Sequence, residues 1–205
     1  TRYDSYGNKI KITSGDYTHG VWALDKCEKY FEYINNTEYW MFLQMREYEY
    51  NYNKDDNFVM SGDKRIFYDN SEIYGDINGQ GLPTKIQLFR SESDFITKRI
   101  VYDVYGNIIE TIDPMGNHIT FEYDPVFHTY KTKESSPEVN GITIVTQTEY
   151  NEYGLPIRYI DPDNSMTELK YDSFHRVIKK ILPYDSETYP TEMYEYHEAD
   201  NSTDG

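Results

Sequence analysis

The sequence has a single cysteine and only 20 basic residues against 36 acidic ones, which gives a net charge of −16. The lone Cys27 excludes an internal disulfide framework and a zinc site built from cysteines. The acidic excess repels phosphate backbones and anionic lipid, so nucleic acid and membrane surfaces are poor partners. No apolar run approaches the roughly 18 residues that a membrane span needs, and no signal peptide is visible.

Tyrosine is the residue that the sequence has in excess, with 23 copies against 9 phenylalanines and 2 tryptophans. Tyrosine favours β-strands, where its ring packs and its hydroxyl stays in contact with water. An aromatic content of 17% also argues against disorder. The composition therefore predicts a folded, acidic, all-β protein.

An internal repeat organises the sequence. The motif Tyr-Asp-x-Tyr-Gly-Asn occurs at residues 3–8 and again at 102–107. Three landmarks recur 48 residues apart, and chance does not readily place three in one register. The paired landmarks are Tyr102 and Tyr150, Ile112-Asp113-Pro114 and Ile160-Asp161-Pro162, and Tyr123-Asp124 and Tyr171-Asp172.

Each repeat unit reads as a β-hairpin. Gly106-Asn107 predicts a two-residue type II′ turn with glycine first, and Asp113–Gly116 has the proline and glycine positions of a type I turn. Residues 118–123 alternate polar and apolar side chains with period two, which indicates a strand. Gly141–Tyr150, rich in Ile, Val and Thr, predicts another. A hairpin cannot bury its own apolar face, so the units are expected to stack.

The chain is expected to have three parts. Residues 1–83 are an irregular, aromatic-rich β segment that begins with one repeat, and all eight prolines lie at or beyond Pro83. Residues 84–198 are regular hairpins, with a double unit at 102–149 and 150–197, and 199–205 form a polar tail. Because no polar capping unit is visible at either end, we interpret the whole as a piece of a much longer protein.

Two segments of the irregular part allow competing interpretations. Apolar residues between Val21 and Ile34 fit a helical spacing, but the aromatic run Tyr30–Tyr33 favours a strand. Glu47–Tyr52 alternates strictly, which also indicates a strand. We expect strands in both places, with polar loops at 53–57 and 70–81.

The repeat resembles the YD repeat of the RHS family, which includes rearrangement-hotspot proteins, teneurins and the B and C components of bacterial insecticidal toxin complexes. The resemblance is carried by Tyr102–Gly106, then Asp113–Gly116 about ten residues later, and then Phe121–Asp124. The irregular part resembles more specifically the middle region of the toxin-complex B component. The matching segments there are Glu38–Met41, Ile66–Asp69 and Gly81–Lys85.

Three sites depart from the family pattern. Asn151 replaces an aspartate, Pro125–His128 lacks the expected glycine, and Asp163-Asn164 stands where the first unit has Met115-Gly116. We expect those units to pair as strands with different turns. The resemblance implies a single-layer β-sheet that spirals into a shell, closed around a toxic polypeptide until delivery. The self-cleaving aspartyl site of such proteins has no counterpart here.

No catalytic, cofactor or metal residue is predicted. The series Asp161, Asp163, Ser165 and Asp172 imitates a calcium loop, but Met166 stands where glycine is needed and no helices flank it. The acidic residues from Asp200 to Asp204 are undecided. The histidines lack metal-ligand spacing, and Cys27 is interpreted as a small packing residue.

The predicted functional residues are those that set turns and strand registers. They are Tyr3, Asp4, Gly7, Tyr102, Asp103, Gly106, Asp113, Pro114, Gly116, Tyr123, Asp124, Tyr150, Gly154, Asp161, Pro162, Tyr171 and Asp172.

Two functions are compatible with these residues. The first is a structural segment of a secreted or cell-surface bacterial shell, whose partners are the rest of its own chain, an enclosed polypeptide and other toxin-complex subunits. The alternative is an extracellular module that recognises glycan or a cell-surface partner through exposed tyrosines, although cross-strand tyrosine pairs that hold a thin sheet together explain the same residues. An enzyme is not expected.

Overall fold

The computed structural model describes residues 1–15, 17–18, 21–22, 26–36, 41–52, 58–91 and 94–197. It divides into two compact units, Thr1–Asn117 and His118–Gly205. The strands of both units pair antiparallel, and no described residue is helical. The predicted class, an all-β protein of stacked antiparallel hairpins, is confirmed. The tail at 199–205, with its acidic residues, lies outside the described residues, as do Glu38–Trp40 and the loop at 53–57.

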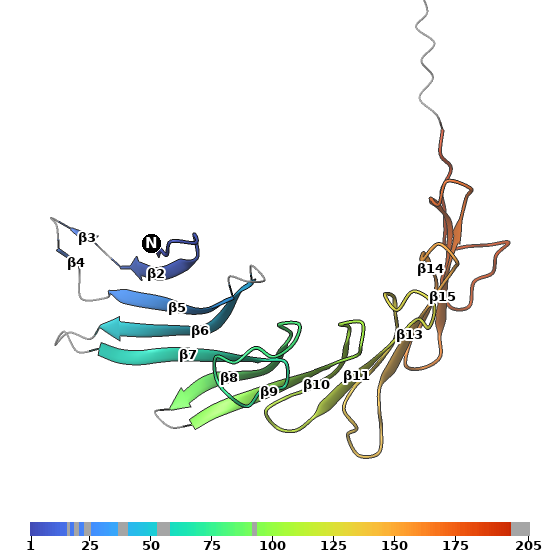
Figure 1. The fold of residues 1–205 in the computed structure, drawn as a ribbon. Coiled ribbons are helices and arrows are strands. Elements are labelled where there is room, and N and C mark those ends of the chain that lie inside the picture. The colour runs from blue at the N-terminus through green and yellow to red at the C-terminus, as the bar shows by residue number, and fades with distance from the viewer. Residues whose placement is uncertain are drawn as a thin grey trace, which may run out of the picture. The chain divides into compact units, whose positions relative to one another are not determined.

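The first unit is one antiparallel sheet in which strands pair in the order β1-β2-β5-β6-β7-β8-β9-β10, plus a separate pair β3-β4. Figure 1 shows β5, β6 and β7 running side by side as long successive strands. The strands are β1 (Arg2–Tyr3), β2 (Lys9–Ser14), β3 (Tyr17–Thr18), β4 (Val21–Trp22), β5 (Cys27–Asn36), β6 (Met41–Tyr52), β7 (Phe58–Tyr68), β8 (Pro83–Ser91), β9 (Asp94–Tyr102) and β10 (Ile108–Ile112).

The second unit repeats the same plan with shorter strands, which pair in chain order from β11 to β17. Its strands are β11 (His118–Tyr123), β12 (Lys131–Ser135), β13 (Val145–Tyr150), β14 (Pro156–Ile160), β15 (Met166–Tyr171), β16 (Val177–Ile181) and β17 (Glu192–Met193). Along β11, exposed and half-buried side chains alternate, as the period-two pattern predicts.

Within each unit the sheet is a single layer. Each strand of the described residues contacts only the strands before and after it in the pairing order. The buried apolar side chains are Phe67, Tyr68, Ile100 and Ile181, and no described side chain is completely enclosed. Such a sheet lacks the second layer against which a domain normally buries its apolar face.

Contacts between neighbouring strands take the place of that core. Tyr30 on β5 lies directly opposite Tyr48 on β6, and their rings stack at 5.1 Å between centroids. Arg158 on β14 lies 2.7 Å from Glu149 on β13 and 3.0 Å from Glu168 on β15, so one side chain ties three strands together. Cross-strand pairs of this kind each contribute roughly 0.2–1 kcal/mol. The tyrosine pairing expected for a thin sheet is present.

The structure confirms both strand assignments in the irregular part and corrects one in the regular part. Cys27–Asn36 and Met41–Tyr52 are strands, so the helical spacing from Val21 to Ile34 has no structural meaning where the chain is described. The strand predicted from Gly141 begins only at Val145. Asn140 and Gly141 both have positive φ and form a tight turn between Val139 and Ile142, which bond each other, so the first residues of the predicted strand belong to this turn.

Candidate functional site

The Asp103 carboxylate shapes the turn that joins β9 to β10. Its Oδ1 accepts the backbone N–H groups of Tyr105 and Asn107, both at 2.9 Å, and its Oδ2 accepts the Asn107 side-chain amide at 3.0 Å. The Gly106 N–H donates to the Asp103 carbonyl at 3.2 Å, and Gly106 has φ +88°. A carboxylate that bonds its own backbone two residues on is an Asx-turn.

This geometry corrects the predicted turn type. The turn that Gly106 closes has Val104 and Tyr105 at its centre, whereas a two-residue type II′ turn was expected to have Gly106 and Asn107 there. Only the glycine of that pair has positive φ, which matches a turn followed by a glycine bulge. The carboxylate of Asp103 decides the outcome, because it holds the N–H groups on both sides of Gly106.

The same aspartate turn recurs along both units. Asp4, Asp113, Asn151 and Asp172 each accept the backbone N–H two residues on and the one four residues on, at 2.8–3.0 Å. In each turn the residue at the glycine position donates its N–H to the carbonyl of the first residue. The asparagine substitution at 151 keeps the turn because only one side-chain oxygen is needed. His175 takes the positive-φ position in the last turn.

Burial raises the pKa of Asp103, but the bonds from the Asn107 amide and the backbone N–H groups lower it more. The net pKa lies below its usual range, as it does for Asp4, Asp113 and Asp172. These carboxylates therefore stay ionised while the turns are formed.

Two turns are built differently. At Asp161-Pro162, the Ser165 N–H bonds Asp163 Oδ1 at 2.9 Å, and Asn164 adopts the positive φ expected of glycine. At Asp124 the loop is longer, so that the Asp124 N–H bonds the Tyr130 carbonyl at 2.9 Å. Of the three departures from the family pattern, these two have the different turns that were expected, whereas the expectation was wrong at Asn151, which keeps the aspartate-type turn.

Four tyrosines at the turn edge have a separate role, in which each links one hairpin to the hairpin before it. The Tyr171 hydroxyl donates to the Pro156 carbonyl at 2.7 Å, and the Tyr150 hydroxyl donates to the Lys131 carbonyl at 3.0 Å. In each case the acceptor is the first strand residue after the preceding turn. Tyr102 and Tyr196 make the same bond to the carbonyls of Pro83 and Val177.

These tyrosine links form where backbone pairing between hairpins has ended. Pairing of β14 with β15 stops at Arg158 and Glu168, short of the turn edge. The Tyr171 hydroxyl spans the remaining separation and satisfies a carbonyl that the ladder has left. Burial raises the pKa of Tyr171 and Tyr150, so both hydroxyls remain protonated donors at neutral pH.

The structure separates the predicted residues into these two groups. Asp4, Gly7, Asp103, Gly106, Asp113, Gly116, Gly154 and Asp172 form the turns, and Tyr102, Tyr150 and Tyr171 form the links. Tyr3 is exposed, while Tyr123 is half-buried at the end of β11. Pro114 and Pro162 are exposed in their turns.

Sequence reasoning missed two contributors to the turns and links. Tyr196 makes a link although His197 stands where aspartate is expected; its only signal is the resemblance of Tyr194–His197 to the strand end at 121–124. Asp69 forms an aspartate turn across a loop of twelve residues, accepting the N–H groups of Gly81 and Leu82. No local spacing reveals that pairing.

Sequence reasoning also missed a pair of buried carboxylates in the first unit. Glu28 is 5% exposed and lies 2.8 Å from both Lys11 Nζ and Lys26 Nζ, while the hydroxyls of Tyr30 and Tyr52 donate to it. Asp63 is 4% exposed and is bonded by two arginines, Arg46 at 2.8 Å and Arg65 at 2.9 Å. Both carboxylates are fully partnered, which is typical of structural ion pairs.

The described residues hold no cluster of three or more metal-ligating side chains. The described part of the chain likewise has no helix that is long and apolar enough to cross a membrane. Burial raises the pKa of the Cys27 thiol, which makes it a poor nucleophile.

Solved structures that are similar to this chain come from toxin complexes. The crystal structure of TcdB2-TccC3-Cdc42 is 13% identical with a TM-score of 0.43, over 83% of this chain and 10% of that one. The crystal structure of TcdB2-TccC3 is 15% identical with a TM-score of 0.43, over 78% and 10%. The Photorhabdus luminescens Tc holotoxin pore is 15% identical with a TM-score of 0.42, over 87% and 11%.

This chain spans about a tenth of the length of those chains. No family model and no curated protein matches the sequence.

Proposed function

We propose that this chain is a non-enzymatic wall segment of a YD-repeat shell that encloses a polypeptide cargo. The observation that carries the proposal is the tyrosine link. Tyr102, Tyr150, Tyr171 and Tyr196 each fasten one hairpin to the hairpin before it. A sheet assembled in this way extends one hairpin at a time, as a repeat protein extends one repeat at a time. It therefore needs no globular core.

The single layer supports a wall more than a globular binding domain. Its stabilising contacts run along the sheet, through cross-strand pairs, aspartate turns and tyrosine links. A layer of this kind leaves two faces that contact other material. The net charge of −16 on 205 residues favours hydrated faces to which an unfolded polypeptide adheres poorly.

The resemblance also supports the proposed partners and location. We place the chain in a secreted or delivered bacterial protein, with the rest of its own polypeptide, an enclosed cargo and other toxin-complex subunits as partners. The glycan alternative needs open ring faces. The rings of Tyr30 and Tyr48 face one another at 5.1 Å, as do those of Tyr130 and Tyr150, so neither pair offers its facing surfaces to a sugar.

Limited proteolysis of the full-length protein that contains this chain tests the proposal. The protein is digested intact and after mild opening with urea, and surviving fragments are identified by mass. Enclosure predicts a polypeptide outside the repeats that survives until the particle opens. Immediate cutting of every region outside the repeats would show that no chamber exists.

Matched variants connect that protection to this segment. Tyr171→Phe removes one link and is expected to lower the urea concentration at which the enclosed polypeptide becomes accessible. Tyr184→Phe makes the same chemical change at a fully exposed tyrosine and should leave that urea concentration unchanged. If the enclosed polypeptide is protected but becomes accessible at the wild-type urea concentration in both variants, the cargo is enclosed, and the link made by Tyr171 does not limit the opening of the particle.

A further inference from the structure

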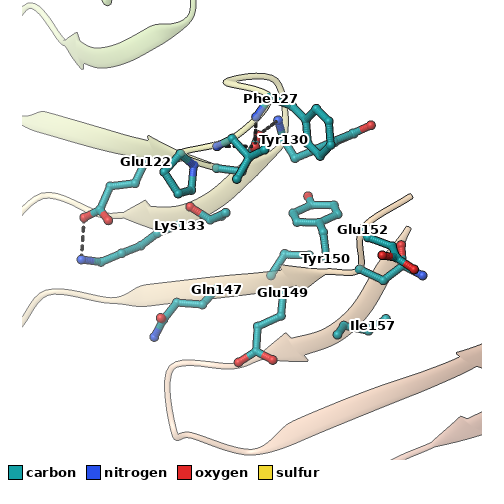
Figure 2. Close-up of a pocket in the computed structure, with 15 residues that line it drawn as sticks. Glu122, Phe127, Tyr130, Lys133, Gln147, Glu149, Tyr150, Glu152 and Ile157 are labelled. Atoms are coloured by element: carbon teal, nitrogen blue, oxygen red, sulfur yellow. Dashed lines mark hydrogen bonds and ion pairs between the residues drawn. The ribbon is translucent and has the colours of Figure 1, made fainter. Parts of the chain in front are cut away.

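The second unit contains a pocket that arises where the sequence departs from its own repeat. The pocket has a volume of about 650 Å³ and lies between the Asp124 loop, β12, β13 and the start of β14. That volume is within the range of small-ligand sites. Figure 2 shows Tyr150 pointing from β13 across the pocket toward Tyr130.

The unusual length of the Asp124 loop builds one wall of this pocket. Asp124 is 9% exposed, and its carboxylate accepts four backbone N–H groups, including those of Phe127 and Tyr130. Burial raises the Asp124 pKa, but those four bonds lower it well below the usual range. The loop is thereby fixed, and it holds the Phe127 ring edge-on to Tyr130 at 5.9 Å between centroids.

The opposite wall is fitted to the same tyrosine. The rings of Tyr130 and Tyr150 stack at 5.1 Å. A Cβ atom on Gly154 would overlap the Tyr130 hydroxyl, so only glycine leaves room for this ring at that turn. The aromatic side of the pocket is therefore preorganised before any ligand arrives.

The floor of the pocket lies where two strands separate. Pairing of β12 with β13 ends at Lys133 and Gln147, and Thr132 and Thr148, which both line the pocket, are not paired with each other. Thr148 pairs instead with Tyr159 on β14, and the Lys131 carbonyl at this separation accepts the Tyr150 hydroxyl at 3.0 Å. The floor is therefore formed by two threonines at a strand separation whose nearest carbonyl is already bonded.

The charges around the pocket favour a cation. Glu122, Glu149 and Glu152 line it along with a single basic side chain, Lys133, which pairs with Glu122 at 2.7 Å. Glu149 pairs with Arg158 at 2.7 Å, while Glu152 is an exposed carboxylate at the rim. The Phe127 ring, 55% exposed, offers a cation a second kind of contact through its face.

We propose that this pocket binds the guanidinium of an arginine side chain presented by a polypeptide. The exposed Phe127 ring takes the flat face of the guanidinium, and the Glu152 carboxylate at the rim balances its charge and accepts its N–H groups. This inference goes beyond the wall function and does not depend on it.

A titration followed by NMR of the 15N-labelled chain tests the site. The probe is the blocked tripeptide acetyl-Gly-Arg-Gly-amide, and the control is the same peptide with citrulline, which keeps the shape of arginine without its charge. Shifts are expected at the amides of Phe127, Tyr130 and Glu152, with a Kd on the order of millimolar for a single exposed contact of this type. The citrulline peptide should bind at least fivefold more weakly.

Variants locate the binding. Phe127→Ala and Glu152→Gln change exposed side chains and should each weaken binding severalfold without altering the rest of the spectrum. Phe174→Ala also removes an exposed phenylalanine from a turn, that of Asp172, but Phe174 does not line the pocket; this variant is the matched control and should bind as the wild type.

Three outcomes would overturn the proposal. Equal binding of the citrulline peptide would remove the role of charge. Shifts at the same residues with maltohexaose and none with the arginine peptide would assign the pocket to glycan. If no probe shifts any amide at a concentration 20 times the expected Kd, the pocket is only a consequence of the longer loop.

Discussion

The buried carboxylate of Glu28 provides the sharpest test of how this sheet is held together. Burial raises its pKa, but the bonds from Lys11, Lys26, Tyr30 and Tyr52 outweigh burial and lower the pKa from 4.5 to about 2. A difference of about 2.5 units at about 1.4 kcal/mol per unit is about 3 kcal/mol of stability. The group is nearly inaccessible, so solvent screening removes little of that figure.

The direction in which stability changes with pH follows from the linkage between proton binding and folding. The folded pKa lies below the unfolded one, so this stability is fully present above about pH 4.5 and is lost as the pH falls toward 2. We expect Glu28→Gln to destabilise the chain by about 3 kcal/mol at pH 7. At pH 3 the wild type has lost about 2 kcal/mol of this contribution, so the wild type and Glu28→Gln should differ in free energy of unfolding by only about 1 kcal/mol.

Urea unfolding at pH 7, 5, 4 and 3, followed by circular dichroism, measures this difference. Glu122→Gln is the matched control, because it removes one charge from an exposed pair with Lys133 and should cost under about 0.5 kcal/mol at every pH. If the difference between Glu28→Gln and wild type were the same at pH 7 and pH 3, the ion cluster would not be the source of the stability.

Two further predictions concern the repeat itself. Tyr171→Phe should lower the free energy of unfolding in urea by about 1 kcal/mol, because it removes one hydrogen bond and leaves a half-buried carbonyl without that donor. Tyr184→Phe should leave the free energy of unfolding unchanged. Equal losses in the two variants would refute the tyrosine link. Gly154→Ala and Gly106→Ala both force alanine into positive φ, which should lower the free energy of unfolding by about 1–2 kcal/mol. Only Gly154→Ala also displaces Tyr130, so its free energy of unfolding should fall by about 1 kcal/mol or more beyond that of Gly106→Ala in the same assay. Equal costs for the two alanines would mean that Tyr130 moves aside freely.

Much of the fold was predictable because the repeat is local. Period-two alternation at 118–123 and the Tyr-Asp and Asp-Pro landmarks mark strands and turns from neighbouring residues alone. The error at Gly106 has a physical origin: the glycine and asparagine fit a type II′ turn, but the Asp103 carboxylate accepts three hydrogen bonds that favour another turn. Side-chain competition of this kind is not visible in turn propensities.

The features that sequence reasoning missed depend on separate strands. Glu28 collects Lys11 from β2 and Tyr52 from β6, and no spacing in the sequence indicates that the three meet. The pocket likewise depends on a loop two residues longer than the repeat and on the point where β12 and β13 stop pairing. Both require the register of the sheet, which a single sequence does not specify.

The two halves of the Tyr-Asp motif solve two different problems of a one-layer sheet. The aspartate closes a turn within a hairpin, and the tyrosine closes the separation between that hairpin and the one before it. Neither function needs a residue far away in the sequence, since the link from Tyr171 reaches back only 15 residues and that from Tyr102 only 19. Short-range contacts of this kind favour rapid folding and allow one hairpin to open without unfolding its neighbours. Loss of a single link should therefore expose one hairpin to proteases before the others, which a globular core would not permit.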